Sequence, residues 1–328
     1  MTDADALVIG GSRFIGRHTV AALADAGYDV TIFNRGTHDH PFGSAVDRVE
    51  GDRREDDDLR RARDAVDPAV VVDCVAYYPR DVRVACEVFA DVEGYVFISS
   101  GAAYGAERVP KREGETALHP CSDEQATDDT WETYGNRKAE ADREVFVAAE
   151  RGVNAMSLRP PIVYGPHDYT ERFDYWVDRV DGADRVLVPG DGTNLRHLVY
   201  VEDVADAVVT LLDRGEPGEA YNVGDDHLPT LGEWVDLVAD ACGSHPTVVH
   251  AGERELAAGD LTHEDFPLYR PYPHVLDTTK LRTLGWRSTA HEEAVAATVE
   301  HVRERGFEGD RGPDREAEAR VLDILETM

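Results

Sequence analysis

Lysine is almost absent from this chain of 328 residues. Only Lys111, Lys138 and Lys280 occur, and arginine supplies the rest of the 34 basic residues. Aspartate and glutamate number 66 and are spread along the whole chain, so the formal net charge is −32. An acidic surface of this kind repels nucleic acids, whose phosphates bind to basic surfaces. The composition therefore argues against nucleic acid as a partner and favours a halophile's surface, adapted to a cytoplasm of very high salt.

Cysteine and long apolar runs are also scarce. The four cysteines show no C-x-x-C spacing, so we expect reduced thiols rather than disulfides or a metal site. No run approaches 18 apolar residues, which argues against a membrane-spanning helix. The N-terminal residues lack the basic flank and cleavage pattern of a signal peptide. The sequence also lacks H-E-x-x-H, Walker and G-x-S-x-G motifs. We therefore expect a cytoplasmic protein without a metal site.

Short apolar runs alternate with amphipathic segments through the first half of the chain. Continuous apolar strands in such an alternation are typical of a parallel sheet that helices cover on both faces. Because crossovers between parallel strands are right-handed, the predicted fold class is α/β, a Rossmann-like doubly wound parallel sheet. Strands are expected at 6–11, 28–33, 47–52, 68–76, 94–100 and 153–161, and helices at 14–26, 55–66, 80–92 and 134–151.

The alternation becomes irregular beyond this half. Residues 162–197 are rich in aromatic, charged, glycine and proline residues, and one more helix and strand follow at 202–214 and 218–224. We expect a nucleotide-binding domain of residues 1–165 and 198–226. A smaller, interwoven C-terminal substrate lobe would contain residues 166–197 and 227–328. An apolar stripe on the last helix, near 313–327, predicts docking on its own lobe or on a subunit partner in a homodimer.

A glycine-containing turn joins the first strand to the first helix in "ALVIGGSRFIGRHTV". Gly10 and Gly16 match two glycines of a dinucleotide-binding turn, and Arg13 stands in the region of the missing middle one. The start of a helix favours an anion, because its amides point outward and its dipole is positive there. This turn predicts that a cofactor pyrophosphate contacts Gly10, Ser12, Arg13, Phe14, Ile15 and Gly16.

The second strand ends in "TIFNRG", without the acidic residue that accepts hydrogen bonds from the ribose of NAD. Asn34 and Arg35 stand there instead. A guanidinium binds phosphate with paired, charge-assisted hydrogen bonds, and Arg13 is able to approach the same group. The sequence thus favours NADP over NAD.

The segment "TYGNRKAEA" places Tyr134 and Lys138 four residues apart on an expected helix, and therefore on one face. An ammonium beside a phenol stabilises the phenolate, lowers the phenol pKa and makes tyrosine a usable acid or base near neutral pH. Retention of a lysine where almost every other cation is arginine indicates that the site needs an ammonium. Ser99 and Ser100 stand at the carboxyl end of the fifth strand, at the sheet edge where ligands bind in such folds.

Together these segments resemble an extended short-chain dehydrogenase/reductase of the NAD-dependent epimerase/dehydratase family, over almost the whole chain. Within it, "GGSRFIGRH" and "FNRG" resemble an atypical branch that contains chloroplast stem-loop RNA-binding proteins and sugar epimerase-like proteins. The motifs that carry the resemblance are "GGSRFIG", "GDR", "DCVA", "FISSGAAYG", "YGNRK", "LRPPIVYGP", "GDGTNLRHLVYVEDVADAV" and "YNVG".

The resemblance implies Tyr134 as acid/base, Lys138 as the residue that lowers its pKa and binds the nicotinamide ribose, and Ser100 as the residue that orients the reacting hydroxyl. It also implies that Arg196 holds the diphosphate of a nucleotide sugar. Further cofactor contacts are implied for Asp52 and Arg53 near the adenine, Val75, Ala76 and Ser99 along the cofactor, and Pro160, Ile162 and Val163 near the nicotinamide. Candidate substrate contacts are Tyr77, Ala102 and His167.

Two departures from the family pattern bear on the substrate. Gly101 and Ala102 replace the Asp-Glu pair of sugar dehydratases, so a 4,6-dehydratase is not expected. Ile162 replaces a frequent asparagine, which argues against a standard nucleotide sugar. We expect an NAD(P)-dependent epimerase, reductase or dehydrogenase that acts by hydride transfer on a small sugar-like molecule. The alternative is a non-catalytic, RNA-binding or redox-sensing protein of the atypical branch.

Overall fold

The computed structural model describes residues 4–38, 40–309 and 311–327. It divides into two compact units. Unit 1 contains Met1–Pro161, Val201–Gly224 and Leu276–Arg287, and unit 2 contains Ile162–Tyr200, Asp225–Val275 and Ser288–Met328.

The two units differ from the sequence-based division at four places, one of which is residues 225–226, assigned to unit 2. Residues 276–287 lie in unit 1, where Lys280 Nζ donates a hydrogen bond to Ala220 O over 2.8 Å. Residues 162–165 and 198–200 lie in unit 2, where two short strands pair with each other. The other three segments therefore belong to the unit that contains their pairing partners, although the partners are distant in the sequence.

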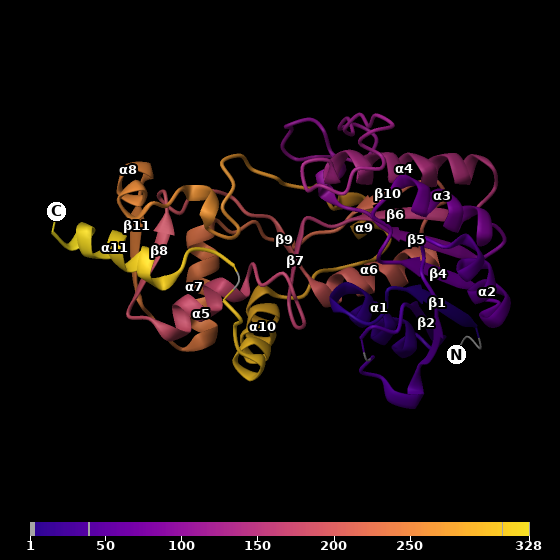
Figure 1. Cartoon of the computed structure of the whole chain (residues 1–328), viewed down its shortest axis with the longest axis horizontal. Coiled ribbons are helices and arrows are strands. Elements are labelled where there is room, and N and C mark those ends of the chain that lie inside the picture. Colours follow the sequence, from indigo (N-terminus) through magenta and orange to yellow (C-terminus); the bar gives the residue numbers. More distant parts are fainter. Residues whose placement is uncertain (1–3, 39, 310, 328) are drawn as a thin grey trace. The chain divides into compact units, whose positions relative to one another are not determined.

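Unit 1 is built around a parallel sheet of seven strands among the described residues, in the order β10-β6-β5-β4-β1-β2-β3. This is the doubly wound order with one strand added at the edge, and it confirms the predicted fold class (Figure 1). The strands are β1 (Asp5–Ile9), β2 (Asp29–Asn34), β3 (Asp47–Glu50), β4 (Val70–Asp73), β5 (Gly94–Ile98), β6 (Ala155–Arg159) and β10 (Ala220–Asn222).

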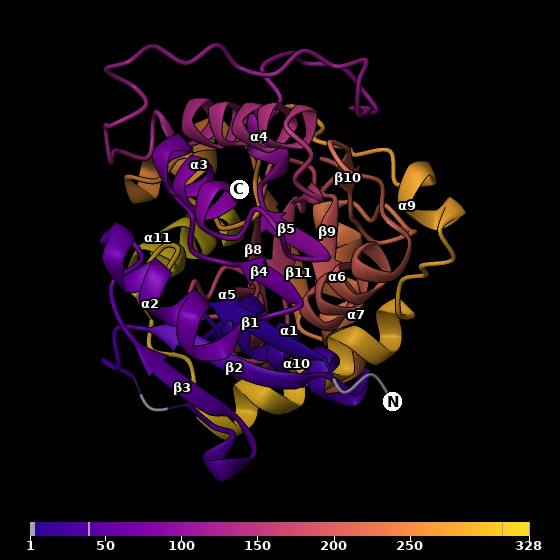
Figure 2. The same ribbon diagram turned by 90° about the vertical axis from the view of Figure 1, so that its right-hand side faces the viewer.

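Helices cover the sheet because successive side chains along each buried strand point to opposite faces. Leu7, Ile9 and Phe97 pack in one apolar cluster with residues of three helices: α2 (Asp56–Val66), α3 (Pro79–Val88) and α4 (Tyr134–Glu150). Two other helices, α1 (Phe14–Asp25) and α6 (Val201–Arg214), pack against each other, as α3 and α4 do (Figure 2). Unit 1 also contains the short helices η1 (Gly43–Ala45), η2 (Gly101–Ala103) and α9 (Thr279–Thr283).

Unit 2 contains two small parallel sheets. One pairs β7 (Ile162–Tyr164) with β9 (Leu198–Tyr200), and the other pairs β8 (Arg185–Pro189) with β11 (Thr247–Ala251). Its core contains Tyr164, Phe173 and Trp234, whose rings lie 4.8 to 5.7 Å apart. The helices are α5 (Asp174–Gly182), α7 (Leu231–Cys242), α8 (Glu253–Leu256), η3 (Ala257–Gly259), η4 (His263–Asp265), α10 (His291–Arg305) and α11 (Arg315–Glu326). No helix of the described residues has the length and hydrophobicity to cross a membrane.

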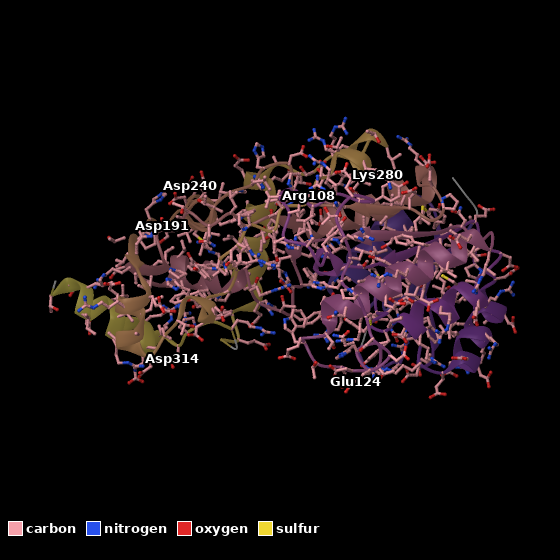
Figure 3. The ribbon with its side chains drawn as sticks, turned by 90° about the horizontal axis from the view of Figure 1, so that it is seen from above. Arg108, Glu124, Asp191, Asp240, Lys280 and Asp314 are labelled. Carbon is pink, nitrogen blue, oxygen red and sulfur yellow. The ribbon has the colours of Figure 1, made fainter. Side chains whose placement is uncertain are left out.

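Charged side chains are distributed over helices and loops alike, as the labelled Asp240 of α7 and the labelled Glu124 and Asp191 outside helices and strands illustrate (Figure 3). The three lysines share one kind of contact. Each of the three donates a hydrogen bond to at least one main-chain carbonyl: Lys111 to Ala106 O, Lys138 to Ala76 O and Ile98 O, and Lys280 to Ala220 O. The few ammonium groups of the chain therefore hold its backbone in place.

Candidate functional site

The turn after β1 needs glycine at both predicted positions. Gly10 has φ +94°, and a Cβ atom there would lie 2.5 Å from the Val75 side chain. A Cβ atom on Gly16 would lie 2.2 Å from Gly10 O, which is shorter than any tolerable contact. Phe14, the first residue of α1, also has a positive φ of +29°. The backbone is thus folded tightly at the start of α1, where an anion is favoured.

Asn34 connects this turn to the end of β2. Its side-chain amide donates a hydrogen bond to Ser12 Oγ, and its side-chain oxygen accepts one from the Gly36 amide over 2.9 Å. The side chains of Arg13 and Arg35 are exposed. Asn34 therefore holds the turn, while both arginines remain accessible to a ligand. Ile15 is half-buried in the first turn of α1.

Arg53 is buried, and its guanidinium forms ion pairs with Asp73 and, over 3.1 Å, with Asp81. Burial acts to lower the Arg53 pKa, but the two carboxylates outweigh it and the pKa is raised. Asp52 is half-buried, and its amide donates to Asp58 Oδ2 over 2.8 Å. These ion pairs fix the segment after β3, while the buried Nε atom of Arg53 has no hydrogen-bond partner among the described residues.

The carboxyl ends of β4, β5 and β6 bring several predicted residues to one edge of the sheet. Ala76 is fully buried after β4, and Ser99 is buried after β5, where its amide donates to Leu158 O over 2.8 Å. The Ser99 hydroxyl has no hydrogen-bond partner among the described residues. Pro160 O accepts a hydrogen bond from the Gly101 amide over 2.7 Å. This edge is where ligands bind in doubly wound sheets.

Lys138 is buried on the inward face of α4. Its ammonium donates to Ala76 O over 2.9 Å and to Ile98 O over 2.8 Å, and it lies 4.5 Å from the centre of the Phe97 ring. Burial lowers the Lys138 pKa to about 8, although Asp73 acts in the opposite direction. The ammonium is thus fixed between the ends of two neighbouring strands.

Tyr134 and Ser100 lie beside this lysine. Tyr134 begins α4, and its ring centre is 5.9 Å from Lys138 Nζ. Ser100 caps the start of η2, where its hydroxyl accepts a hydrogen bond from the Ala102 amide over 3.1 Å. A Cβ atom on Gly135 would lie 2.6 Å from Ala102 O. Gly135 therefore allows the backbone of α4 to approach that of η2, and the structure brings the three predicted catalytic residues into one region.

Arg137 was not singled out in the sequence, yet it is buried beside Tyr134. It donates to Tyr77 O over 3.1 Å and to Thr130 O over 2.8 Å. The Tyr77 side chain is 40% exposed, and its ring centre lies 5.4 Å from Lys138 Nζ. The predicted substrate contacts Tyr77 and Ala102 thus both lie next to the Tyr134–Lys138 pair.

The remaining predicted residues belong to unit 2. Ile162 and Val163 lie in β7 and pair with Leu198 and Val199 of β9. His167 has φ +67°, and its ring centre lies 4.2 Å from that of His301.

Arg196, also in unit 2, is 8% exposed, and its Nε atom has no hydrogen-bond partner within the described chain. Burial, together with the like charges of Arg270 and Arg172, lowers the Arg196 pKa to about 9. Clustered cations with a buried, unsatisfied donor are suited to bind an anion.

Sequence reasoning missed Gly135, Arg137 and Arg270. A glycine directly after the candidate tyrosine is unfavourable inside a helix, and this was the available signal for a close backbone approach. Nothing in the local sequence around Arg137 or Arg270 indicates their partners. No group of histidine, cysteine, aspartate and glutamate in the described part of the chain has the arrangement to hold a metal ion.

Comparison with known proteins gives matches over most of the chain. The low-salt glycan biosynthesis protein Agl12 of Haloferax volcanii is 25% identical over 330 residues, covering 90% of this chain and 98% of that protein. The chloroplast stem-loop binding protein of 41 kDa b of Arabidopsis thaliana is 25% identical, over 86% of this chain and 74% of its own length.

Among solved structures, the UDP-glucose 4-epimerase of Thermus thermophilus in complex with NAD has a TM-score of 0.70 and 26% identity, and the match covers 91% of this chain and 99% of that one. The family model described as "NAD dependent epimerase/dehydratase family" matches residues 6–90 and 81–224. The family match, together with the glycine turn and the Tyr134–Lys138 region, confirms the resemblance inferred from the sequence: the chain belongs to the NAD-dependent epimerase/dehydratase family.

Proposed function

We propose that this protein is an NAD(P)-dependent epimerase or reductase that acts on a sugar, with a nucleotide sugar as the favoured substrate class. The observation that carries the proposal is the placement of Tyr134 one helical turn from a buried Lys138 ammonium, at the carboxyl edge of the sheet. Ser100 supplies a hydroxyl in the same region.

The residues around the first turn fit a dinucleotide. Gly10 and Gly16 place no side chain where the turn after β1 meets α1, and the exposed Arg13 and Arg35 are suited to a 2′-phosphate. Asp52, Val75, Ala76 and Pro160 would line the rest of the cofactor. A bound nicotinamide would supply reversible hydride transfer.

The protein's own residues would manage the proton. Tyr134 would accept the proton of the substrate hydroxyl as the hydride leaves the same carbon, and would return it in the reverse direction. The Lys138 ammonium would favour the phenolate through its charge. Ser100 would hold the reacting oxygen by a hydrogen bond. Reduction of the resulting ketone on its other face gives an epimer, whereas release of the ketone gives net oxidation.

The arginine cluster of unit 2 supports a substrate that carries a diphosphate. Arg196, Arg172 and Arg270 influence one another electrostatically, in a chain whose net charge is −32. A phosphate group would satisfy the buried Nε of Arg196 and offset the repulsion among the three cations. The apolar Ile162 leaves the sugar itself unassigned.

The similarity to the chloroplast stem-loop binding protein supports a second candidate, a protein that binds RNA without turnover. The net charge disfavours RNA, and the Ser100, Tyr134 and Lys138 set favours an enzyme.

Tyr134→Phe tests the proposed reaction. The change removes the proton-transferring hydroxyl but keeps the ring, so turnover of UDP-glucose or UDP-galactose should fall by about 100-fold or more, while the dissociation constant for NADP+ stays nearly the same. Steady-state kinetics and calorimetry measure both. Unchanged turnover in the variant would show that Tyr134 is not the acid/base.

The proposed role of Lys138 requires its charged form, which gives a prediction for pH. The Lys138 pKa is lowered to about 8 in the folded chain, so between pH 8 and 10.5 the folded state binds fewer protons than the unfolded state at this group. The free energy of unfolding of the wild type should therefore rise with pH in this window, relative to that of Lys138→Met.

Denaturant titrations of both proteins at constant molar salt measure this difference. We expect the wild type to gain roughly 1 to 2 kcal/mol on the variant between pH 8 and 9.5. The constant loss of the two hydrogen bonds in the variant cancels in the comparison. A difference that does not change with pH would contradict the lowered pKa.

Arg13 in the first turn and Arg35 directly after β2 predict that the protein prefers NADP. Replacing Arg13 and Arg35 together by serine should weaken NADP+ binding by about tenfold or more and leave NAD+ binding unchanged, because only NADP+ carries the 2′-phosphate. Arg108→Ser, at an exposed arginine paired with Glu115, is the control. Equal loss of both cofactors, or a wild type that prefers NAD+, would refute the preference for NADP.

Arg196→Gln tests the diphosphate assignment. Calorimetry with UDP as the ligand should show binding weakened by about tenfold or more, since a charge-assisted pair is lost. Arg254→Gln, at an exposed arginine of α8, should bind UDP as the wild type does. If the Arg196 variant also binds UDP normally, the cluster serves another anion.

A further inference from the structure

One indole of the protein is exposed beside the candidate acid/base. Trp131 is 75% exposed, whereas Trp176, Trp234 and Trp286 are at most 3% exposed. Burial of apolar area is the source of hydrophobic stabilisation, so an indole left mostly in water contributes little of it. The fold alone therefore does not account for the position of Trp131.

Two contacts join Trp131 to Tyr134. Their rings stack nearly parallel, with centroids 4.8 Å apart and an interplanar angle of 11°. The main chain is joined as well, because the Tyr134 amide donates to Trp131 O over 3.2 Å. The indole is thus fixed relative to the phenol both by its ring and by its backbone.

The place of Tyr134 in its helix explains why such a contact is needed. Helical side chains lean toward the preceding turn and pack on it. Tyr134 is the first residue of α4, so no helical turn precedes it, and the Thr133 side chain makes no capping hydrogen bond among the described residues. Trp131, three residues earlier, provides the surface that a preceding turn would otherwise supply.

The segment that carries Trp131 is itself held in place. Arg137 donates to Thr130 O over 2.8 Å and to Tyr77 O over 3.1 Å, and it is buried. Thr130 is further held by Asp128, whose carboxylate accepts hydrogen bonds from the Thr130 hydroxyl over 2.6 Å and from its amide over 3.2 Å. The backbone on the N-terminal side of the indole is thus tied to the turn after β4.

We propose that Trp131 is a positioning residue for Tyr134: its indole fixes the orientation of the phenol ring, and Arg137 fixes the segment that presents the indole. The inference rests on the proposed role of Tyr134 as the acid/base. Catalysis depends on orientation, and a displaced acid/base lowers the rate without weakening ground-state binding.

Near-ultraviolet circular dichroism tests the stack without any substrate. The wild-type spectrum minus that of Trp131→Phe isolates the signal of Trp131, which a rigidly stacked indole makes large. The same difference should persist in a Tyr134→Phe background, which keeps a ring, and should be lost in a Tyr134→Ala background. A difference signal that survives Tyr134→Ala would overturn the proposed stack.

Steady-state kinetics test whether the position of Trp131 affects turnover. With NADP+ and UDP-glucose or UDP-galactose, Trp131→Ala should lower kcat by about two- to tenfold, the change expected if one aromatic pair acts on the transition state alone. KM and the NADP+ dissociation constant should stay unchanged, and Trp131→Phe should restore most of kcat because a phenyl ring still stacks. Val109→Ala, at another strongly exposed apolar residue of unit 1, is the control.

Two kinetic results would overturn the proposal. Wild-type kcat in Trp131→Ala would show that the indole does not position the phenol, and a raised KM with unchanged kcat would show that it contacts the substrate directly. Failure of the proposed function is a separate result, because it appears as full turnover in Tyr134→Phe, whereas the spectroscopic test requires no turnover.

Discussion

The buried ammonium of Lys138 joins the three segments that form the candidate site. From α4 it reaches the carbonyl of Ala76 after β4 and that of Ile98 at the end of β5. An ammonium has three donors on one compact nitrogen, so it can hold two carbonyls at once. Burial disfavours the charged form of Lys138 and so lowers its pKa, and the negative charge of Asp73 offsets part of this effect. The register of α4 against the sheet, and hence the place of Tyr134, depends on this contact.

The sequence was most informative where local pattern decides structure. Apolar runs such as that around Leu7 predicted the strands, and Gly10 and Gly16 marked a turn in which a Cβ atom has no room. It was least informative where the partner is distant in the chain. Arg53 pairs with Asp73 and Asp81, 20 and more residues away, and no periodicity indicates such a pair. The contacts of Gly135 and Arg137 were missed for the same reason, although their spacing from Tyr134 was visible.

Arginine and lysine differ in the geometry of their hydrogen-bond donors. Arginine presents a planar fork of donors and suits carboxylates, as in the pair of Arg303 with Asp181 over 2.6 and 2.9 Å. Lysine presents a point charge, and the three lysines bind main-chain carbonyls, while Lys111 and Lys280 also pair with Glu107 and Glu219. Arginines also reach main-chain carbonyls, as Arg137 does at Tyr77 and Thr130, so both residue types tie side chains to the backbone in this chain.

The contact between Gly135 and Ala102 has a consequence for how the family can diverge. Because backbone atoms meet there, the spacing between η2 and α4 is set by van der Waals radii and not by the size of any side chain. Neighbouring side chains can then be exchanged over evolutionary time without altering the distance between Ser100 and Tyr134. Residues on the outer side of α4 can therefore change, for example to acidic residues, while the spacing between η2 and α4 stays the same.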